Sequence, residues 1–268
     1  MAEKAKSSGG VGELIKTIVY ALLLAGIIRT VIFQPFWIPS GSMKPSLLIG
    51  DFLFVNKFAY GYSAYSCPGY REWNLCAFAE GSDGRVLEKM PARGDVVVFR
   101  HPVSGQDYIK RLIGLPGDTV EMRGGQVILN GAVVPQEAIE PFVETRELQG
   151  PTRTPPRCSA TVGLGGACEK DQFIETLPNG VSHPTLNIGN GGTDNAGPFT
   201  VPDRQFFFMG DNRDNSADSR LSRVAGGVGF VPIENLIGRA DRIIFSSAGS
   251  SILFFWTWRR DRFFKAIE

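Results

Sequence analysis

Gln126-Val-Ile-Leu-Asn-Gly-Ala-Val-Val134 is the part of this sequence that says most about its architecture. Two short runs of aliphatic, partly β-branched residues flank Asn130-Gly131. An Asn-Gly pair between such runs is the strongest short-range signal for a β-hairpin. Because a tight hairpin makes its two strands antiparallel, the stretch predicts antiparallel β structure.

Similar short runs lie on both sides of this hairpin. Residues 51–56, 95–100, 204–209 and 243–246 are rich in β-branched or aromatic residues and are bounded by turn residues, as strands usually are. The chain also holds 32 glycines and 17 prolines, which helix interiors tolerate poorly. We therefore predict a mainly β protein with one long helical pattern near the N-terminus.

The composition limits the class of protein. The 268 residues are 43% hydrophobic and 21% charged, which is enough for a folded core and excludes global disorder. Lysine and arginine together number 28 against 27 aspartates and glutamates, giving a net charge of +1. A nucleic-acid-binding protein would normally carry a basic excess, so we expect no nucleic-acid partner.

The four cysteines fall into two local pairs, Cys67 with Cys76 and Cys158 with Cys168. Neither pair has the Cys-x-x-Cys spacing of a zinc site, and the chain has only two histidines, so we expect no metal. Two short-range disulfides fit the spacing and would indicate an oxidising compartment. Four cysteines allow three connectivities, and four buried free thiols are the alternative.

The N-terminal region has the pattern of a membrane anchor. Residues 1–15 are polar, and residues 16–34 are mostly apolar but contain Arg29, which would have to lie near one end of a span. A cleavable signal peptide is the main alternative, although bulky residues follow the apolar run instead of a small-x-small site. Lysines before the apolar run favour a cytoplasmic N-terminus, which would place a β domain of residues 35–250 outside the cell membrane.

Two further segments have less definite patterns. Residues 251–268 mix phenylalanines and tryptophans with arginines, which fits either an interfacial segment that contacts membrane lipid or a terminal helix docked on the sheet. Residues 135–200 are poor in apolar runs and rich in glycine, proline and polar residues. We interpret them as a surface insertion held by a bond between Cys158 and Cys168.

Ser40-Gly-Ser42 is the first stretch that could carry chemistry. Two serines flank a glycine, so the backbone can turn sharply and present a hydroxyl beside backbone N–H groups. A serine nucleophile needs a base. His101 and His183 each precede a proline, which restricts their backbone, and lysine is the usual substitute for histidine. Taken alone, the stretch would be better explained as a plain loop after a helix.

Lys110 is the candidate base. Strand alternation in residues 107–114 places it on one face with Tyr108 and Leu112, where burial would favour the neutral amine. At a reference pKa of ~10.4 about 0.04% of lysine is neutral at pH 7, whereas a pKa of ~8 raises this to about 9%. The polar loop 210–220 supplies hydroxyls and carboxylates that could hold the amine in place.

Together these stretches resemble bacterial type I signal peptidase, the membrane-bound leader peptidase. The matching motifs follow the family's order: Ser40-Gly-Ser-Met-Lys-Pro-Ser-Leu47, Arg93-Gly-Asp-Val-Val-Val-Phe99, Asp107-Tyr-Ile-Lys-Arg111 with Gly114-Leu-Pro-Gly-Asp118, and Gly210-Asp-Asn-Arg-Asp-Asn-Ser-Ala-Asp-Ser-Arg220. The resemblance implies a mainly β catalytic domain of coiled antiparallel sheets with a β-ribbon insertion, here about residues 120–205, behind one transmembrane helix.

The resemblance also implies roles for individual residues. Ser42 would be the nucleophile, Lys110 the general base, and Ser40 with the Ser42 backbone N–H the oxyanion hole. Support for the dyad would come from Ser216, which would orient the Lys110 amine, and from Asp218 and Arg220. Lys44 would not be the base, because a residue two positions along from Ser42 is poorly placed to reach its hydroxyl.

Five apolar residues match family positions that line the substrate pockets: Phe36, Ile38, Met43, Leu47 and Ile109. Ordinary core packing is the alternative for each. One departure from the family pattern is Ser46, where threonine is usual. A second is that residues 140–200 contain no family motif. We take this insertion to be structural, so that deleting residues 145–195 should spare peptide cleavage.

The implied activity is removal of signal peptides from exported preproteins after an Ala-x-Ala-like motif, without metal or cofactor. The enzyme would be a monomer with a single span in the bacterial cytoplasmic (inner) membrane, its catalytic domain on the periplasmic side. Its partners would be preprotein signal peptides and membrane lipid. The rival hypotheses are a self-cleaving repressor-type Ser/Lys protease and a membrane-anchored binding module without catalysis.

Overall fold

The hairpin predicted from Asn130-Gly131 is present in the structure, a computed structural model that describes residues 10–27, 33–66, 76, 84–249 and 253–267. Strands β6 (Gln126–Leu129) and β7 (Ala132–Val133) pair antiparallel. Asn130 and Gly131 have φ angles of 53° and 82°, as a tight turn of this kind requires. The local turn chemistry therefore fixes this hairpin as expected.

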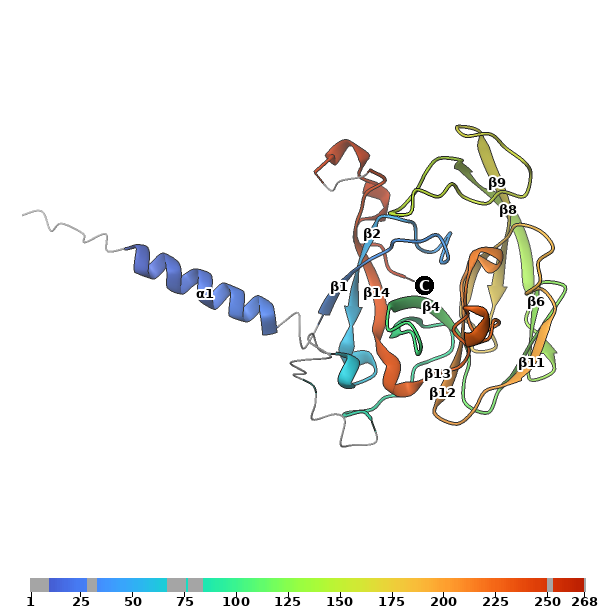
Figure 1. Cartoon of the computed structure of the whole chain (residues 1–268), viewed down its shortest axis with the longest axis horizontal. Coiled ribbons are helices and arrows are strands. Elements are labelled where there is room, and N and C mark those ends of the chain that lie inside the picture. Colours follow the sequence, from blue (N-terminus) through green and yellow to red (C-terminus); the bar gives the residue numbers. More distant parts are fainter. Residues whose placement is uncertain (1–9, 28–32, 67–75, 77–83, 250–252, 268) are drawn as a thin grey trace, which may run out of the picture.

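The described chain contains one α-helix and fourteen strands, with short 3-10 turns between them (Figure 1). The remaining elements are α1 (Val11–Ile27), β1 (Phe33–Trp37), β2 (Asp51–Asn56), β3 (Val96–Arg100), β4 (Asp107–Gly114), β5 (Thr119–Arg123), β8 (Gln136–Thr145), β9 (Ala167–Thr176), β10 (Ser182–Asn187), β11 (Ala196–Thr200), β12 (Gln205–Met209), β13 (Val231–Pro232) and β14 (Leu236–Ser246). The prediction of a mainly β protein is confirmed.

The strands form three antiparallel sheets. The main sheet has seven strands in the order β1-β2-β14-β3-β4-β12-β13, and the two smaller sheets have the orders β11-β5-β6-β7 and β10-β9-β8. Both smaller sheets lie between β4 and β12 in the chain, so they form the insertion that the sequence indicated near residues 120–205. Figure 1 shows β8 and β9 extending together beyond the main sheet.

At β12, both faces of the main sheet are buried. Along β12, Phe206 and Phe208 face one hydrophobic cluster, whereas Phe207 and Met209 face another that includes residues of β5 and β6. Successive side chains of a strand point to opposite faces, so this alternation packs the insertion against one face and the rest of the domain against the other. Burying one such aromatic side chain is worth about 1.5–3 kcal/mol.

The register of the main sheet positions two of the predicted site segments. In β4, Lys110 lies opposite Val97 of β3, and Arg111 lies opposite Met209 of β12. Because the polar loop 210–220 starts directly after Met209, it begins beside Lys110. The pairing of β4 with β12 thus brings together segments that are about a hundred positions apart in sequence.

The N-terminal helix differs from its predicted bounds of 16–34. It begins at Val11 and ends at Ile27, while Phe33 and Gln34 belong to β1 and pair with β2. Pro35 disfavours a helix around it, and the aromatic residues of β1 are favoured in strands. Residues 28–32, with Arg29, lie outside the described residues. No helix within the described ranges is both long and apolar enough to cross a bilayer.

The predicted Cys158–Cys168 disulfide is present, with an S–S distance of 1.95 Å. It joins the loop after β8 to the start of β9, and it rules out free thiols at these two positions. Cys67 lies outside the described residues, so its pairing with Cys76 stays a prediction.

The C-terminal tail, described from residue 253, folds back along β14. Isolated β-bridges join Trp258 to Ser247 and Ala266 to Arg242, and only 3-10 turns, Phe255–Thr257 and Arg260–Arg262, interrupt this path. The tail is therefore docked on the sheet, but within its described part it is not the terminal helix that we considered.

Candidate active site

The candidate nucleophile lies in the loop between β1 and β2. Backbone hydrogen bonds close the base of this loop, from Ile38 N to Asp51 O (2.9 Å) and from Gly50 N to Ile38 O (3.0 Å). Met43 and Leu47 are fully buried and fix the loop to the core. Ser42 is thereby held with 8% of its surface exposed.

Lys110 and Ser42 are in direct contact. The Lys110 Nζ donates a hydrogen bond to Ser42 Oγ at 2.7 Å, and a second to its neighbour's carbonyl, Ile109 O, at 3.0 Å. Lys110 is 4% exposed, and its Nζ lies 5.6 Å from the centre of the Tyr108 ring, as strand alternation predicted. A serine hydroxyl and an amine at this distance satisfy the geometry of a nucleophile and its base.

Burial lowers the pKa of Lys110 to about 8. The main cause is desolvation, which penalises the charged ammonium. The carboxylates of Asp218 and Asp211 oppose this by attracting the charge, and Arg220 adds to the lowering. The amine therefore loses its proton more than two pH units below an ordinary lysine.

The loop 210–220 contains a fully buried ion pair whose charges act on Lys110. Asp218 Oδ1 and Oδ2 accept from Arg220 Nε and Nη2, both at 2.9 Å, and Oδ2 also accepts from the Gly210 N–H at 3.0 Å. Desolvation acts to raise the Asp218 pKa, but Arg220 outweighs it and the pKa is lowered. Asp218 thus remains a carboxylate near Lys110.

Ser216 lies in the same region without the predicted contact. Its Oγ is buried and makes no hydrogen bond to Lys110, although its hydroxyl contributes to the lowering of the Asp218 pKa. A Cβ at Gly210 would approach Ser216 Oγ to 2.3 Å and Ser42 O to 2.5 Å, so only glycine lets this hydroxyl lie so close to the nucleophile turn. Orientation of Lys110 by Ser216 stays a prediction.

A second buried network lies beside the dyad, and sequence reasoning missed it. Arg111 is fully buried and donates to both oxygens of Asp211 at 2.8 Å, while Ser46 Oγ donates to Asp211 Oδ2 at 2.5 Å. The network ties β4 and the loop 210–220 to the nucleophile loop. These residues lie inside the quoted motifs, but only the pairing of β4 with β12 shows that they meet.

Asn212 also holds the nucleophile turn and was not predicted. Its backbone N–H donates to Ser42 O at 3.1 Å, and its Nδ2 donates to Gly41 O at 2.9 Å. These two bonds occupy the carbonyl groups of the turn. They fix the turn against the loop 210–220.

Ser40 lies at the edge of the site. Its Oγ is 3.4 Å from Ser42 Oγ, and the residue is exposed. An exposed hydroxyl next to a nucleophile can donate to a substrate oxygen, as the predicted oxyanion role needs. The role itself stays a prediction.

The predicted pocket residues lie together in one hydrophobic cluster. Ile38, Met43, Leu47 and Ile109 are 5% exposed or less, and Phe36 is partly exposed against them. Core packing is thus shown for these residues. Their contribution to substrate pockets stays a prediction.

Neither histidine contacts a catalytic serine. His101 Nδ1 accepts from the backbone N–H groups of Val103 and Ser104 at 3.1 Å each. Burial lowers the pKa of His183 to about 4, so it is neutral, and it lies 3.5 Å from Glu175. The basic side chain in contact with Ser42 is therefore a lysine and not a histidine.

The Lys44 ammonium bonds to the insertion and not to Ser42, as expected. Its Nζ bonds to Glu144 and Gln149 of the insertion.

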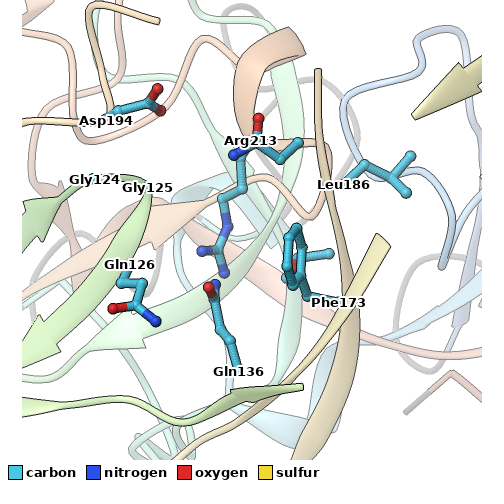
Figure 2. A pocket seen from close by; sticks show the side chains of 10 residues that line it. Gly124, Gly125, Gln126, Gln136, Phe173, Leu186, Asp194 and Arg213 are labelled. Atoms are coloured by element: carbon cyan, nitrogen blue, oxygen red, sulfur yellow. The ribbon is translucent and has the colours of Figure 1, made fainter. Parts of the chain in front are cut away.

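A cavity of about 190 Å³ lies elsewhere, lined by residues of the insertion and by Arg213, and its lining includes neither Ser42 nor Lys110 (Figure 2).

Comparisons with known proteins identify the family of this chain. The chain matches the family described as signal peptidase, peptidase S26, over residues 11–245. Signal peptidase I of Rickettsia typhi (strain ATCC VR-144 / Wilmington) is 35% identical over 253 residues, covering 91% of this chain and 84% of that protein. Signal peptidase I of Rickettsia prowazekii (strain Madrid E) is 35% identical over 236 residues, covering 85% and 78%.

A solved structure of a signal peptidase I from Enterococcus faecalis V583 aligns with 27% sequence identity and a TM-score of 0.30, over 56% of this chain and 97% of that chain. The family match runs through all four quoted motifs and nearly the whole described β domain. This chain therefore belongs to the signal peptidase family, peptidase S26, and is a serine peptidase.

Proposed function

We propose that this enzyme removes N-terminal signal peptides from exported preproteins by cleaving after a small-x-small motif, with Ser42 as nucleophile and Lys110 as general base. The observation that carries the proposal is the 2.7 Å contact between Lys110 Nζ and Ser42 Oγ, made by a lysine with a lowered pKa. Membership of a peptidase family favours an enzyme over a binding module without catalysis. The family match starts at residue 11, within the N-terminal helix, which favours a signal peptidase over a repressor-type protease.

Acyl transfer proceeds through two proton transfers by the same amine. Neutral Lys110 takes the Ser42 proton while Ser42 Oγ attacks the carbonyl carbon of the scissile bond. The developing oxyanion accepts hydrogen bonds from the Ser42 N–H and the Ser40 hydroxyl, and losing one such donor typically costs ~10²–10³ in rate. The protonated Lys110 then gives its proton to the leaving amine of the mature protein.

The acyl-enzyme is hydrolysed by the same groups. Lys110, neutral again, takes a proton from water, which attacks the ester carbonyl. Collapse of the second tetrahedral intermediate breaks the bond to Ser42 Oγ, which regains its proton from Lys110. The signal peptide leaves with a free carboxylate.

The substrate would bind as an added β-strand. Strand β1 is an edge of the main sheet and leads directly into the nucleophile loop, which supports pairing of an extended peptide along it. Alternate side chains of such a peptide would point toward Phe36 and the cluster with Ile38, Met43, Leu47 and Ile109.

The enzyme would act as a monomer at the cytoplasmic membrane, anchored by its N-terminal region with the catalytic domain on the extracytoplasmic side. Membership of a membrane-associated family, lysines before the apolar run and the Cys158–Cys168 disulfide support this placement. The described chain assembles the whole dyad by itself, which supports a monomer. Exposed aromatic residues of the tail support contact with lipid.

The test compares the full-length protein in detergent with its Ser42→Ala variant. Each is incubated with a preprotein that carries an Ala-x-Ala site, and mass spectrometry identifies the products. Cleavage after that motif by the wild type alone would support both the reaction and the nucleophile. Cleavage by both proteins, or by neither while both are folded, would contradict the proposal.

A further inference from the structure

The hairpin formed by β8 and β9 contacts the nucleophile turn through a group of buried charges. Lys44, two residues after Ser42, donates from Nζ to Glu144 Oε2 at 2.5 Å and to Gln149 Oε1 at 2.7 Å. Glu144 is the next-to-last residue of β8, and Gln149 lies in the loop that follows this strand. The insertion thus reaches the segment that carries the nucleophile.

Glu144 compensates two ammonium groups at once. Its other oxygen, Oε1, accepts from Lys170 of β9, and Gln149 Nε2 donates to Oε2 at 2.9 Å. The side chains of Lys44 and Lys170 are 5% and 1% exposed, so neither has much access to water. Without the Glu144 carboxylate, the nearly buried ammonium groups of Lys44 and Lys170 would lack a compensating negative charge.

The Lys44 side chain lies against the turn that presents the catalytic hydroxyls. A Cβ at Gly41 would be 3.3 Å from Lys44 Cε, and the Lys44 N–H donates to Gly41 O at 3.2 Å. On the other side of the turn, Asn212 holds the carbonyl groups of Gly41 and Ser42. The turn is therefore held between the insertion and the loop 210–220.

The same hairpin also supports the loop 210–220. Glu175 of β9 is fully buried and accepts from Arg213 Nη1 and Nη2 at 2.8 and 2.7 Å. Figure 2 shows the Arg213 side chain pointing toward Gln136 on β8, whose Nε2 donates to Glu175 at 3.1 Å. Strand β9 therefore supports the nucleophile turn indirectly through Lys170 and supports the loop 210–220 through Glu175.

From these contacts we propose that Glu144 is a positioning residue for catalysis: by holding Lys44 it fixes the turn from Ser40 to Ser42, so that the nucleophile and the oxyanion donors keep their alignment. The proposal rests on the proposed function of the dyad. It also reverses the expectation that residues 145–195 can be deleted without loss of cleavage, because that deletion removes Gln149, Lys170 and Glu175.

The test measures kcat, KM and the pH dependence of cleavage for Glu144→Gln, Lys44→Met and the double variant. Glu140→Gln is the matched control, since Glu140 is an exposed glutamate on the same strand. Displacement of catalytic groups by about 1 Å can cost ~10²-fold in rate, so we expect kcat to fall by roughly 10- to 100-fold in each single variant. KM should change by less than about twofold, and the pH midpoint should stay that of the wild type, because Lys110 is untouched.

The double variant should lose no more activity than the single variants, since both substitutions break the same contact. Three results would overturn the proposal: kcat unchanged in folded single variants, additive losses in the double variant, or a shifted pH midpoint. If Glu144→Gln does not fold, Lys44→Met alone decides, and a kcat within about twofold of Glu140→Gln overturns the proposal. Absence of cleavage by the wild type would instead contradict the proposed function.

Discussion

Lys110 illustrates how single residues set the chemistry of this site. A shift of its pKa from 10.5 to about 8 represents about 3 kcal/mol of preference for the neutral amine. Burial provides that preference, while Asp218 and Asp211 work against it. The carboxylates keep the shift moderate, so the amine remains basic enough to take the serine proton.

This balance predicts the effect of Asp218→Asn. Loss of the carboxylate removes an attraction that raises the Lys110 pKa and leaves the Arg220 charge uncompensated, so the Lys110 pKa should fall further. The midpoint of the pH–rate profile should therefore move to lower pH than in the wild type. Rates should be measured below the temperature at which the variant unfolds, because an unpaired buried Arg220 costs about 3–5 kcal/mol of stability.

The matched control is Asp203→Asn, which neutralises an exposed carboxylate and should leave the midpoint in place. A midpoint that stays fixed or moves to higher pH in Asp218→Asn would show that Asp218 does not act on Lys110 as described.

At the scale of elements, local signals were sufficient where a turn or a strand is specified by neighbouring residues. The hairpin at Asn130-Gly131 and strand β2 lie where the sequence placed them. The sequence did not predict the individual strands β8, β9 and β10 within the insertion, because their residues show no apolar alternation. Long-range pairing and a disulfide stabilise these strands instead. The helix bound at residue 34 was wrong because β1 pairs with β2.

The candidate site shows the same limit. The contact between Ser42 and Lys110 could be anticipated, because their residue types and motifs indicate a nucleophile and a base. Glu144 and Glu175 could not be anticipated, because each acts through a partner that is distant in the sequence. Glu144 contacts Lys44, about a hundred positions away, and Glu175 contacts Arg213, about forty positions away. No local pattern marks such a contact.

The C-terminal tail provides a prediction at this scale. Arg262 is 6% exposed and donates to both oxygens of the fully buried Asp51, at 3.0 and 2.6 Å, and to Ser46 O at 2.9 Å. Arg262→Ala leaves a buried carboxylate without its cation, so the free energy of unfolding should fall by about 3–5 kcal/mol. Urea denaturation followed by tryptophan fluorescence measures the change.

Arg260→Ala is the control, because Arg260 is exposed in the same turn and should change stability by no more than about 0.5 kcal/mol. Equal stability of the two variants would contradict a structural role for the Arg262–Asp51 pair.

At the scale of the whole molecule, exposed aromatic residues indicate how the protein could contact the membrane. Phe255 and Trp256 of the tail are 61% and 69% exposed, and Trp37 at the end of β1 is 41% exposed. Figure 1 shows α1 on the β1 side of the domain. Aromatic side chains with polar neighbours favour the interface between lipid and water.

If the tail contacts lipid, replacing both Phe255 and Trp256 by serine should slow cleavage of a preprotein in proteoliposomes by about tenfold, the equivalent of about 1.4 kcal/mol of lost burial. Cleavage of a short soluble peptide should not change. Val224→Ser is the control, since Val224 is fully exposed in another loop. Equal slowing of both substrates would argue for damage to the site instead of lost membrane contact.

The pH dependence of kcat/KM for the wild-type enzyme tests most directly whether a buried, neutral Lys110 activates Ser42. Cleavage of a soluble peptide with an Ala-x-Ala site would be followed from pH 6 to 10, under conditions where chemistry limits the rate. We predict a rate that rises with pH through a single midpoint near the Lys110 pKa of about 8 and then levels off. A rate that stays flat over this range would contradict a titrating lysine base.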